Sequence, residues 1–281
     1  MRRPQAKILF SVCGLIGFVC GFIPVEKASA AAWTQATDRG LSIFTFRYAD
    51  AHRRYDENGA AARPADFQKY EIEYYGEFGV TDRTTLVLRS AYQRLIDDGA
   101  DPPMKAYGGD GIEFALRQRL YQRAGFIVSA QPGLTSRSKV QSTGAAPLSG
   151  GGVSYEMRLL GAYGAKIADR KVFLNAEGAY RWRTSRPPNE WRADVTLGFE
   201  AAKKLEVFAQ SFSTISDGDG RAPFEAFRAH KAQLSLAYRI TPKIRLQVGG
   251  FHTYAGKNVL RESGALISVW IDRDYSRKSR R

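Results

Sequence analysis

The feature that most constrains this chain is a repeated alternation of apolar and polar side chains. From Val172 to Arg183, apolar or small residues occupy every second position, and Asn175, Glu177 and Arg181 lie among the positions between them. Successive side chains of a β-strand point to opposite faces, so this segment is predicted to be a strand with one apolar and one ionic face. The pattern recurs, and we expect about twelve such strands. Their predicted spans are 39–48, 68–79, 84–94, 110–121, 125–134, 153–165, 171–183, 191–201, 204–215, 229–240, 243–254 and 262–271.

The length of these segments and their connections favour a membrane barrel. A tilted strand of about ten residues crosses a bilayer. Four connections are short and polar, and four are long, which is typical of barrels with short periplasmic turns and longer extracellular loops. The short ones are 80–83, 168–170, 202–203 and 240–243, and the long ones are 49–67, 95–109, 135–152 and 216–228.

A soluble sandwich has the same alternation with its apolar face buried, so the pattern alone does not separate the two folds. In hydrocarbon, however, an open sheet edge leaves backbone groups without partners, and closure of the sheet removes that edge. We therefore predict the all-β class, as a transmembrane antiparallel β-barrel of about twelve strands over residues 31–275.

Aromatic residues cluster near the predicted strand ends. Rings of this kind are typical of the level at which a barrel meets lipid headgroups. We expect two aromatic girdles, with Tyr180, Trp182 and Trp191 near the outer rim and Phe199, Tyr238 and Trp270 near the inner rim.

The N-terminus has the pattern of a secretory signal peptide. Arg2, Arg3 and Lys7 precede an uncharged apolar run over 8–25, and Ala28-Ser29-Ala30 follows. We predict a signal peptide over residues 1–30, cleaved after Ala30, with cleavage after Ala32 as the second choice. The run is just long enough to be an uncleaved anchor, but Pro24 interrupts it. This segment directs the protein out of the cytoplasm towards the outer membrane.

The exported part is predicted to contain no cysteine. Cys13 and Cys20 are the two cysteines of the chain, and both lie in the predicted signal. Disulfides and cysteine-based zinc sites are therefore excluded from the barrel, and no cofactor or metal is expected.

The chain is strongly basic, with a formal net charge of +14. Such a charge suits nucleic acid, anionic lipid or anionic solutes, and export argues against nucleic acid. We expect outer-membrane lipids and lipopolysaccharide as surroundings and an unspecified small molecule as solute. Residues 265–271 resemble the signal that barrel assembly machinery reads in a last strand, although further residues follow. Residues 276–281 are predicted to be a basic, solvated tail.

The polar face of the strands predicts a charged interior of mixed sign. A barrel of about twelve strands is narrow. One hypothesis is a narrow porin-like channel in which the arginines favour anionic solutes. The alternative is a closed interior cross-linked by Arg–Glu pairs, for example between Glu77 and Arg89. The candidate lumen-lining residues are Glu113, Arg117, Arg119, Glu177, Arg181, Arg183, Arg192, Asp194 and Arg245.

An outer-membrane lipid hydrolase is a less favoured hypothesis. Ser211, Ser213, His230 and His252 share the apolar parity near the outer rim, on strands expected to be neighbours. A serine within hydrogen-bond reach of a histidine can act as a nucleophile. We assign no catalytic residue, because rim positions are wet enough to accommodate Ser and His without catalysis.

Two stretches carry a family resemblance. Residues 74–86, and residues 180–183 together with 191–198, resemble the strand–turn–strand units of uncharacterised proteobacterial outer-membrane proteins. These include the barrels assigned to a "MetA-pathway" of phenol degradation. The resemblance implies passive or facilitated transport. A structural or adhesive barrel is the alternative, because loop sequences do not identify a partner.

Overall fold

The computed structural model describes residues 32–99, 103–137, 141–143, 151–221 and 224–276. The predicted signal peptide and all but Ser276 of the basic tail lie outside them. Twelve long strands and one short strand form the described part. They are β1 (Arg39–Arg54), β2 (Arg63–Thr81), β3 (Thr84–Asp97), β4 (Met104–Arg123), β5 (Phe126–Arg137), β6 (Gln141–Thr143), β7 (Gly152–Ile167), β8 (Arg170–Arg183), β9 (Glu190–Ala202), β10 (Leu205–Ser216), β11 (Arg228–Thr241), β12 (Ile244–Lys257) and β13 (Ser263–Asp274).

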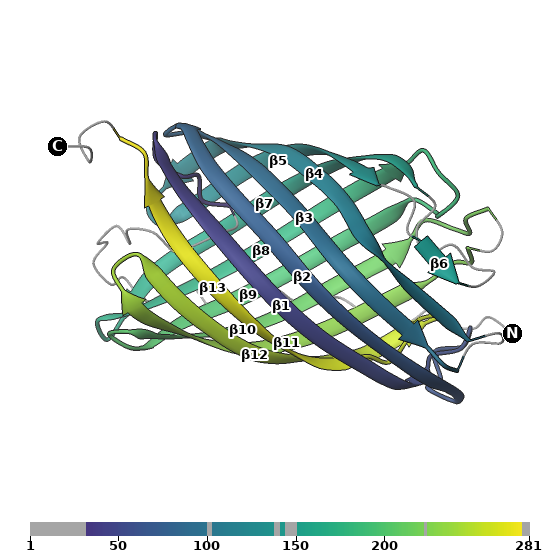
Figure 1. Ribbon diagram of the computed structural model, residues 1–281. Coiled ribbons are helices and arrows are strands. Elements are labelled where there is room, and N and C mark those ends of the chain that lie inside the picture. The colour runs from purple at the N-terminus through teal and green to yellow at the C-terminus, as the bar shows by residue number, and fades with distance from the viewer. Residues whose placement is uncertain (1–31, 100–102, 138–140, 144–150, 222–223, 277–281) are drawn as a thin grey trace, which may run out of the picture.

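The twelve long strands close into a barrel (Figure 1). Neighbours in the sheet pair antiparallel, and β1 completes the circle with β13. The short strand β6 adds only three pairings to β4. Closure leaves no long strand with a free edge, as hydrocarbon requires. The prediction of a barrel of about twelve strands is confirmed. In the described part of the chain, no helix is long and apolar enough to cross a membrane.

Several strands extend beyond their predicted spans. β2 begins at Arg63 and β4 begins at Met104, in both cases at the end that carries the long connections. Strands that project past the bilayer have water on their outer face, so the apolar half of the alternation stops there. The sequence pattern therefore marks the membrane-spanning part and misses these extensions.

The outer face of the barrel is apolar. Leu174 and Leu197 are each 47% exposed, while Asn175, the residue that follows Leu174 on β8, is 3% exposed. A soluble sandwich would bury the two leucines, so the exposed apolar belt identifies a lipid-facing surface. The belt includes Ile72, Leu116, Leu159, Val195, Leu234, Leu236, Val248 and Ile267.

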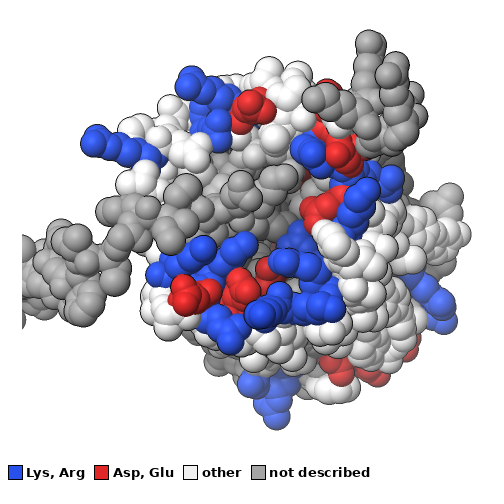
Figure 2. All heavy atoms as spheres, turned by 90° about the vertical axis from the view of Figure 1, so that its left-hand side faces the viewer, with Lys and Arg blue, Asp and Glu red and all other residues white. Residues whose placement is uncertain are grey.

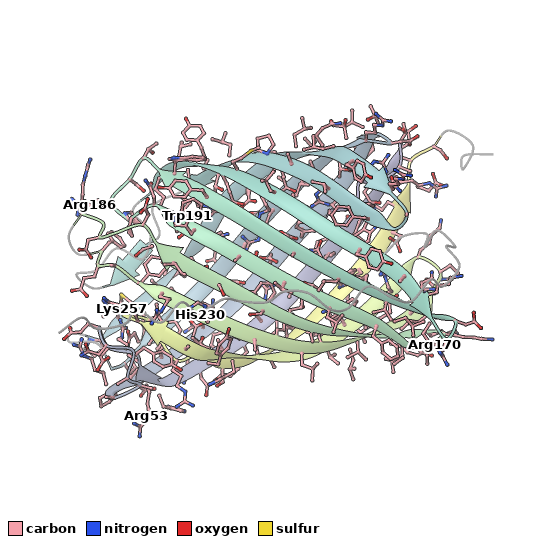
Figure 3. All side chains as sticks on the ribbon, turned by 180° about the vertical axis from the view of Figure 1, so that it is seen from behind. Arg53, Arg170, Arg186, Trp191, His230 and Lys257 are labelled. Carbon is pink, nitrogen blue, oxygen red and sulfur yellow. The ribbon has the colours of Figure 1, made fainter. Side chains whose placement is uncertain are left out.

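The short connections all lie at one end of the barrel, which also holds the start of β1 and the end of β13. Two of them are hairpin turns with residues at positive φ, Ala124 (50°) with Gly125 (81°) and Ala168 (48°) with Asp169 (61°). Two successive positive φ values make the turn whose twist matches the flanking strands. Figure 3 labels Arg170 at this end and Arg53 and Arg186 at the opposite end. We call the two ends the short-turn end and the long-loop end.

Charged side chains surround the short-turn end. Figure 2 looks onto it and shows Lys and Arg gathered around the barrel opening, with Asp and Glu among them. Exposed lysines of the turns contribute, among them Lys203, Lys204 and Lys243.

Five of the six predicted girdle residues belong to the outward face, and Trp270 does not. Trp182, Trp191, Phe199 and Tyr238 are 43–56% exposed, and Tyr180 contacts the rings of Trp182 and Trp191, with centroids 4.7 and 4.5 Å away. The assignment of Trp270 to the girdle is wrong.

Trp270 is 8% exposed and points into the barrel. It stacks on Phe208 at 6.1 Å, and its Nε1–H donates to Gln247 Oε1 at 2.9 Å. The physical reason is parity: Trp270 shares its face of β13 with the buried residues Leu266 and Ser268. Its depth in the strand alone does not say which face it takes.

Candidate functional site

The candidate site is the charged interior of the barrel. The alternation that turns apolar side chains to lipid turns their neighbours inward. Eight of the nine candidate lumen residues make ion pairs there. The ninth, Arg119, lies at the short-turn end, where its backbone N–H donates to the carbonyl of Arg83.

Arg181 on β8 is the centre of one ionic cluster. Only 1% of its side chain is exposed, and it pairs with Glu113 on β4 at 3.2 Å and with Glu156 on β7 at 2.7 Å. Glu190 lies 3.9 Å from its Nε. A buried guanidinium is tolerated when several carboxylates replace its hydration, and Arg181 has that arrangement.

The same cluster continues towards β9. Arg158 lies 2.9 Å from Glu156 and 3.0 Å from Asp194, and it also pairs with Glu177. Glu190 accepts from Arg183 at 2.6 Å and from Arg192 at 2.9 Å. The cluster therefore joins β4, β7, β8 and β9 across one wall of the barrel.

A second ionic cluster joins β1, β2 and β3. Arg47 donates to Glu71 at 2.7 Å, and both Arg47 and Arg89 pair with Glu73. The suggested pairing of Arg89 with Glu77 is wrong, because Arg89 is opposite Tyr75 in the register and its side chain reaches Glu73. Arg47 was not singled out in the sequence, since β1 carries apolar residues on both faces and its alternation is weak.

Arg245 on β12 occupies a third position. Its guanidinium lies 3.5 Å from Glu206 and 3.6 Å from Asp272, and it covers the ring of Trp270 at 4.7 Å. A guanidinium over an indole face gains a cation–π attraction. This arginine is therefore held against the wall by both charge and ring contact.

Residues 32–38 precede β1, and we call them the interior segment. Residues 32–36 lie inside the barrel, and Thr37 and Asp38 are exposed at the short-turn end. Ala32 is fully buried; its N–H donates to Asn175 Oδ1 at 3.3 Å and its carbonyl accepts from Ser129 Oγ at 2.6 Å. Trp33 packs edge-on against Phe173, with ring centroids 5.8 Å apart. Ser129 lies on β5 and both Asn175 and Phe173 lie on β8, on the side of the barrel away from β1. Since the segment continues into β1, it reaches across the interior.

The interior segment is tied to the short-turn end of β2, β3 and β4. The backbone N–H of Gln35 donates to Thr85 Oγ1 at 2.7 Å, and the side-chain amide of Gln35 donates to Glu77 at 2.6 Å. Glu77 also pairs with Arg117 at 2.7 Å, and Arg117 donates to the carbonyl of Trp33 at 3.0 Å. Arg117, a predicted lumen residue, is therefore a contact of the segment.

A turn aspartate anchors the far end of the interior segment. Both the N–H and the hydroxyl of Thr37 donate to Asp82 Oδ1 at 2.9 Å. These hydrogen bonds favour the charged carboxylate and so hold the pKa of Asp82 below its ordinary value, and the bond from the backbone N–H has the larger effect.

Sequence reasoning did not find the interior segment. The only signal is composition: residues 31–37 are Ala-Ala-Trp-Thr-Gln-Ala-Thr, uncharged and mostly small. Such a stretch can enter a narrow polar interior without bringing an unpaired charge.

The interior segment fills part of the interior at the short-turn end, where it contacts β2, β3 and β4. A small void of about 10 Å³ lies beside Arg89, Arg137 and Arg181, which is about the space of one water molecule. A larger cavity of about 270 Å³ opens at the long-loop end. The interior segment therefore lies in the space that a solute crossing the barrel would use.

Of the predicted rim residues, Ser213 and His230 lie together, whereas Ser211 is opposite Ala232 and His252 contacts Ser263, a serine outside the predicted set. Ser213 Oγ is 2.9 Å from His230 Nδ1, and Ser263 Oγ is 2.9 Å from His252 Nδ1. Hydrolases of this type also orient the histidine with a third group. No carboxylate of the described residues pairs with His230, so the geometry does not assemble a triad.

The sequence matches no protein-family model and no curated protein. Solved outer-membrane barrels share the fold. A COG4313 outer membrane channel from Pseudomonas putida F1 aligns with a TM-score of 0.66 and 13% identity, over 88% of this chain and 100% of that chain. The NanC porin aligns with a TM-score of 0.50 and 12% identity, over 82% of this chain and 98% of that chain. At these identities the likeness concerns the fold, and the chain has the fold of an outer-membrane β-barrel.

Proposed function

We propose that this barrel is a narrow outer-membrane channel for small solutes, and that the interior segment closes it. The observation that carries the proposal is a polar interior whose short-turn end is filled by a separate stretch of chain. Barrels of this architecture are either open, water-filled pores or pores plugged by another part of the chain. Here the plugging part is short, and hydrogen bonds fix most of it.

A preference for anions is part of the proposal. Arginine-rich pore linings favour anionic solutes. Most interior arginines are paired with carboxylates, which reduces that preference. The Nε atoms of Arg137 and Arg183, however, are buried with no hydrogen-bond partner in the described part of the chain. The protein leaves these two donors unused, and an anion would reach them only after a local rearrangement of the wall, because both atoms are buried.

The resemblance to the phenol-degradation barrels fits the same proposal, since transport is what it implies. The COG4313 protein and the NanC porin are named as a channel and a porin. The proposal includes outer-membrane lipid and lipopolysaccharide as the surroundings, and insertion by the barrel assembly machinery. A non-conducting structural barrel is the competing outcome of the test.

The test is single-channel recording of the refolded protein in a planar bilayer under a salt gradient. The full-length exported chain is compared with a variant lacking residues 32–37. We expect brief, small openings for the parent, long openings for the deletion, and a reversal potential that indicates anion preference. Heat-modifiable gel mobility shows that both proteins are folded. A folded deletion variant that stays silent would contradict the proposal.

A further inference from the structure

The cavity at the long-loop end has the shape of a small-molecule site. It holds about 270 Å³ and is formed by four loops, those that follow β1, β8, β10 and β12. Pockets for drug-sized ligands occupy about 300–1,000 Å³, so this one suits a single small molecule. Its lining residues are Arg54, Arg63, Pro187, Pro188, Phe224, Glu225, Phe227 and Asn258.

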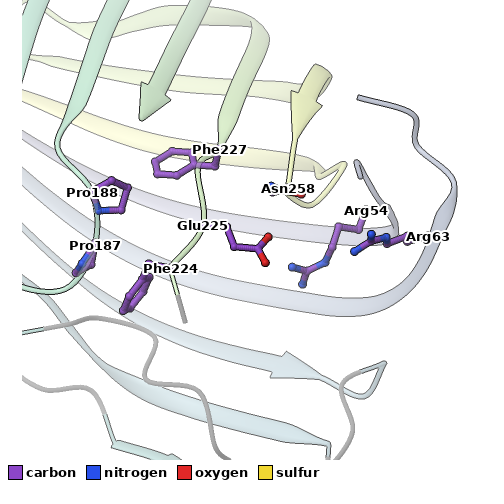
Figure 4. Close-up of a pocket in the computed structure, with 8 residues that line it drawn as sticks. All are labelled: Arg54, Arg63, Pro187, Pro188, Phe224, Glu225, Phe227 and Asn258. Atoms are coloured by element: carbon purple, nitrogen blue, oxygen red, sulfur yellow. The ribbon is translucent and has the colours of Figure 1, made fainter. Parts of the chain in front are cut away.

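The lining is divided into three parts, in the order that Figure 4 shows. Two prolines and two phenylalanines form an apolar wall on one side. Arg54 and Arg63 lie on the other side. Glu225 lies between, with its carboxylate pointing towards the arginines. An apolar group, a cation and an anion would therefore each find a matching surface along one line.

The charged groups of this cavity are available to a ligand. Arg54 lies 3.8 Å from Asp97 and Arg63 lies 3.6 Å from Glu57, both beyond hydrogen-bond distance. The side chains of the two arginines are 41% and 58% exposed. Glu225 is exposed, and no Lys or Arg of the described loops makes an ion pair with it.

We propose that this cavity binds a free α-amino acid with an apolar or aromatic side chain. Arg54 and Arg63 take its carboxylate, since guanidinium groups suit that geometry. Glu225 takes the ammonium group, and the side chain lies against the proline and phenylalanine wall. A peptide N-terminus lacks the adjacent carboxylate, and a simple fatty or aromatic acid lacks the ammonium. The inference rests on the proposed channel function in treating the bound molecule as its solute.

The test is calorimetric titration of the refolded protein in detergent with three compounds. They are L-phenylalanine, 3-phenylpropionate, which lacks the ammonium, and phenethylamine, which lacks the carboxylate. One exposed charge pair is worth a factor of about five in affinity at most. We therefore expect L-phenylalanine to bind more tightly than either analogue, by up to about fivefold.

Two variants assign the two charges. Glu225→Gln should remove the preference for L-phenylalanine over 3-phenylpropionate, and the double variant Arg54→Gln/Arg63→Gln should remove the preference over phenethylamine. Arg261→Gln is the matched control, because this exposed arginine lies on a long-loop-end connection outside the cavity lining. It should leave all three affinities unchanged. Glu225 and Arg261 lie in loops, and Arg54 and Arg63 are end residues of β1 and β2. Heat-modifiable mobility verifies that each variant folds.

Equal affinity for the three compounds, or no binding of L-phenylalanine, would overturn this inference. Conduction is measured separately. If L-phenylalanine binds but the variant lacking residues 32–37 does not conduct, the channel proposal is refuted and the binding site is supported. If the protein conducts but L-phenylalanine does not bind, the binding site is refuted and the channel proposal is supported.

Discussion

Replacement of Gly79 by alanine tests whether the interior segment closes the barrel. A Cβ at Gly79 would lie 2.0 Å from the carbonyl oxygen of Ala36 and 2.8 Å from that of Gln35. Both are backbone atoms, which cannot rotate away as a side chain would. Gly79 itself has no positive φ, so β2 accepts alanine without backbone strain.

The size of the effect follows from the overlap. Ordinary van der Waals contacts lie at 3.4–4 Å, and real Cβ atoms essentially never come closer than 3.0 Å, so the segment must shift by at least about 1 Å beside Gly79. That shift strains the hydrogen bond from the Asp38 N–H to the Gly79 carbonyl, which is 3.0 Å long. Overpacking of this kind costs about 1–3 kcal/mol. The ratio of docked to undocked segment should therefore fall by about 5- to 150-fold.

The assay is the open probability of single channels. Gly79→Ala should open more often than the parent, at the conductance of the variant that lacks residues 32–37. Gly178→Ala is the matched control, since a Cβ there has no atom within 4 Å. The reasoning is refuted if folded Gly79→Ala gates like the parent, or if Gly178→Ala opens the channel equally.

Three further predictions concern charge and lipid. Hydrogen bonds from the interior segment lower the pKa of Asp82, so the stabilisation that they give the docked segment is full above the ordinary pKa near 3.9 and is lost as pH falls through the lowered value. The open probability of the channel should therefore rise in acid. The Asp82→Asn channel should open at neutral pH, and its open probability should not depend on pH. Leu197→Arg on the lipid face should cost about 2–4 kcal/mol near the midplane, whereas the inward Thr196→Arg should be tolerated, and equal heat-modifiable mobility of the two would contradict the face assignment. Arg181→Ala should cost about 3–5 kcal/mol in urea unfolding, because Glu113 loses its arginine partner and Glu156 and Glu190 each lose one of theirs. Arg39→Ala, whose side chain is 45% exposed, should cost less than about 1 kcal/mol, and similar costs for the two would show that the cluster is not coupled.

The strands and their faces could be predicted from the sequence because alternation is a local signal. Leu197 and Thr196 show their faces within a single segment. Trp270 was misplaced because an aromatic ring suits both a lipid rim and a packed interior. The buried side chains of Leu266 and Ser268 show that this face of β13 points inward, and that was known only after the pairing of β13 with β1 was established.

The ion pairs and the interior segment depend on distant contacts, which no local pattern contains. Arg89 could pair with any carboxylate on the adjacent strand, and the structure selects Glu73 over Glu77. Ala32 contacts Ser129 and Asn175, which lie 97 and 143 residues further along the chain. Closure of the barrel brings these residues together, so they could be located only after the whole fold was known.

The composition of the interior segment explains how a barrel with so many buried charges could still open. The side chains of residues 32–37 carry no charge, so their withdrawal separates none of the ion pairs of the clusters. Arg117 would lose the carbonyl of Trp33 but keep Glu77 at 2.7 Å and Gln131 at 2.9 Å. The other bonds broken are neutral or singly charged hydrogen bonds, which water entering the pore replaces at small net cost. The Arg–Glu clusters keep the wall rigid, and the movable element is the part of the interior that can leave without exposing an unpaired charge.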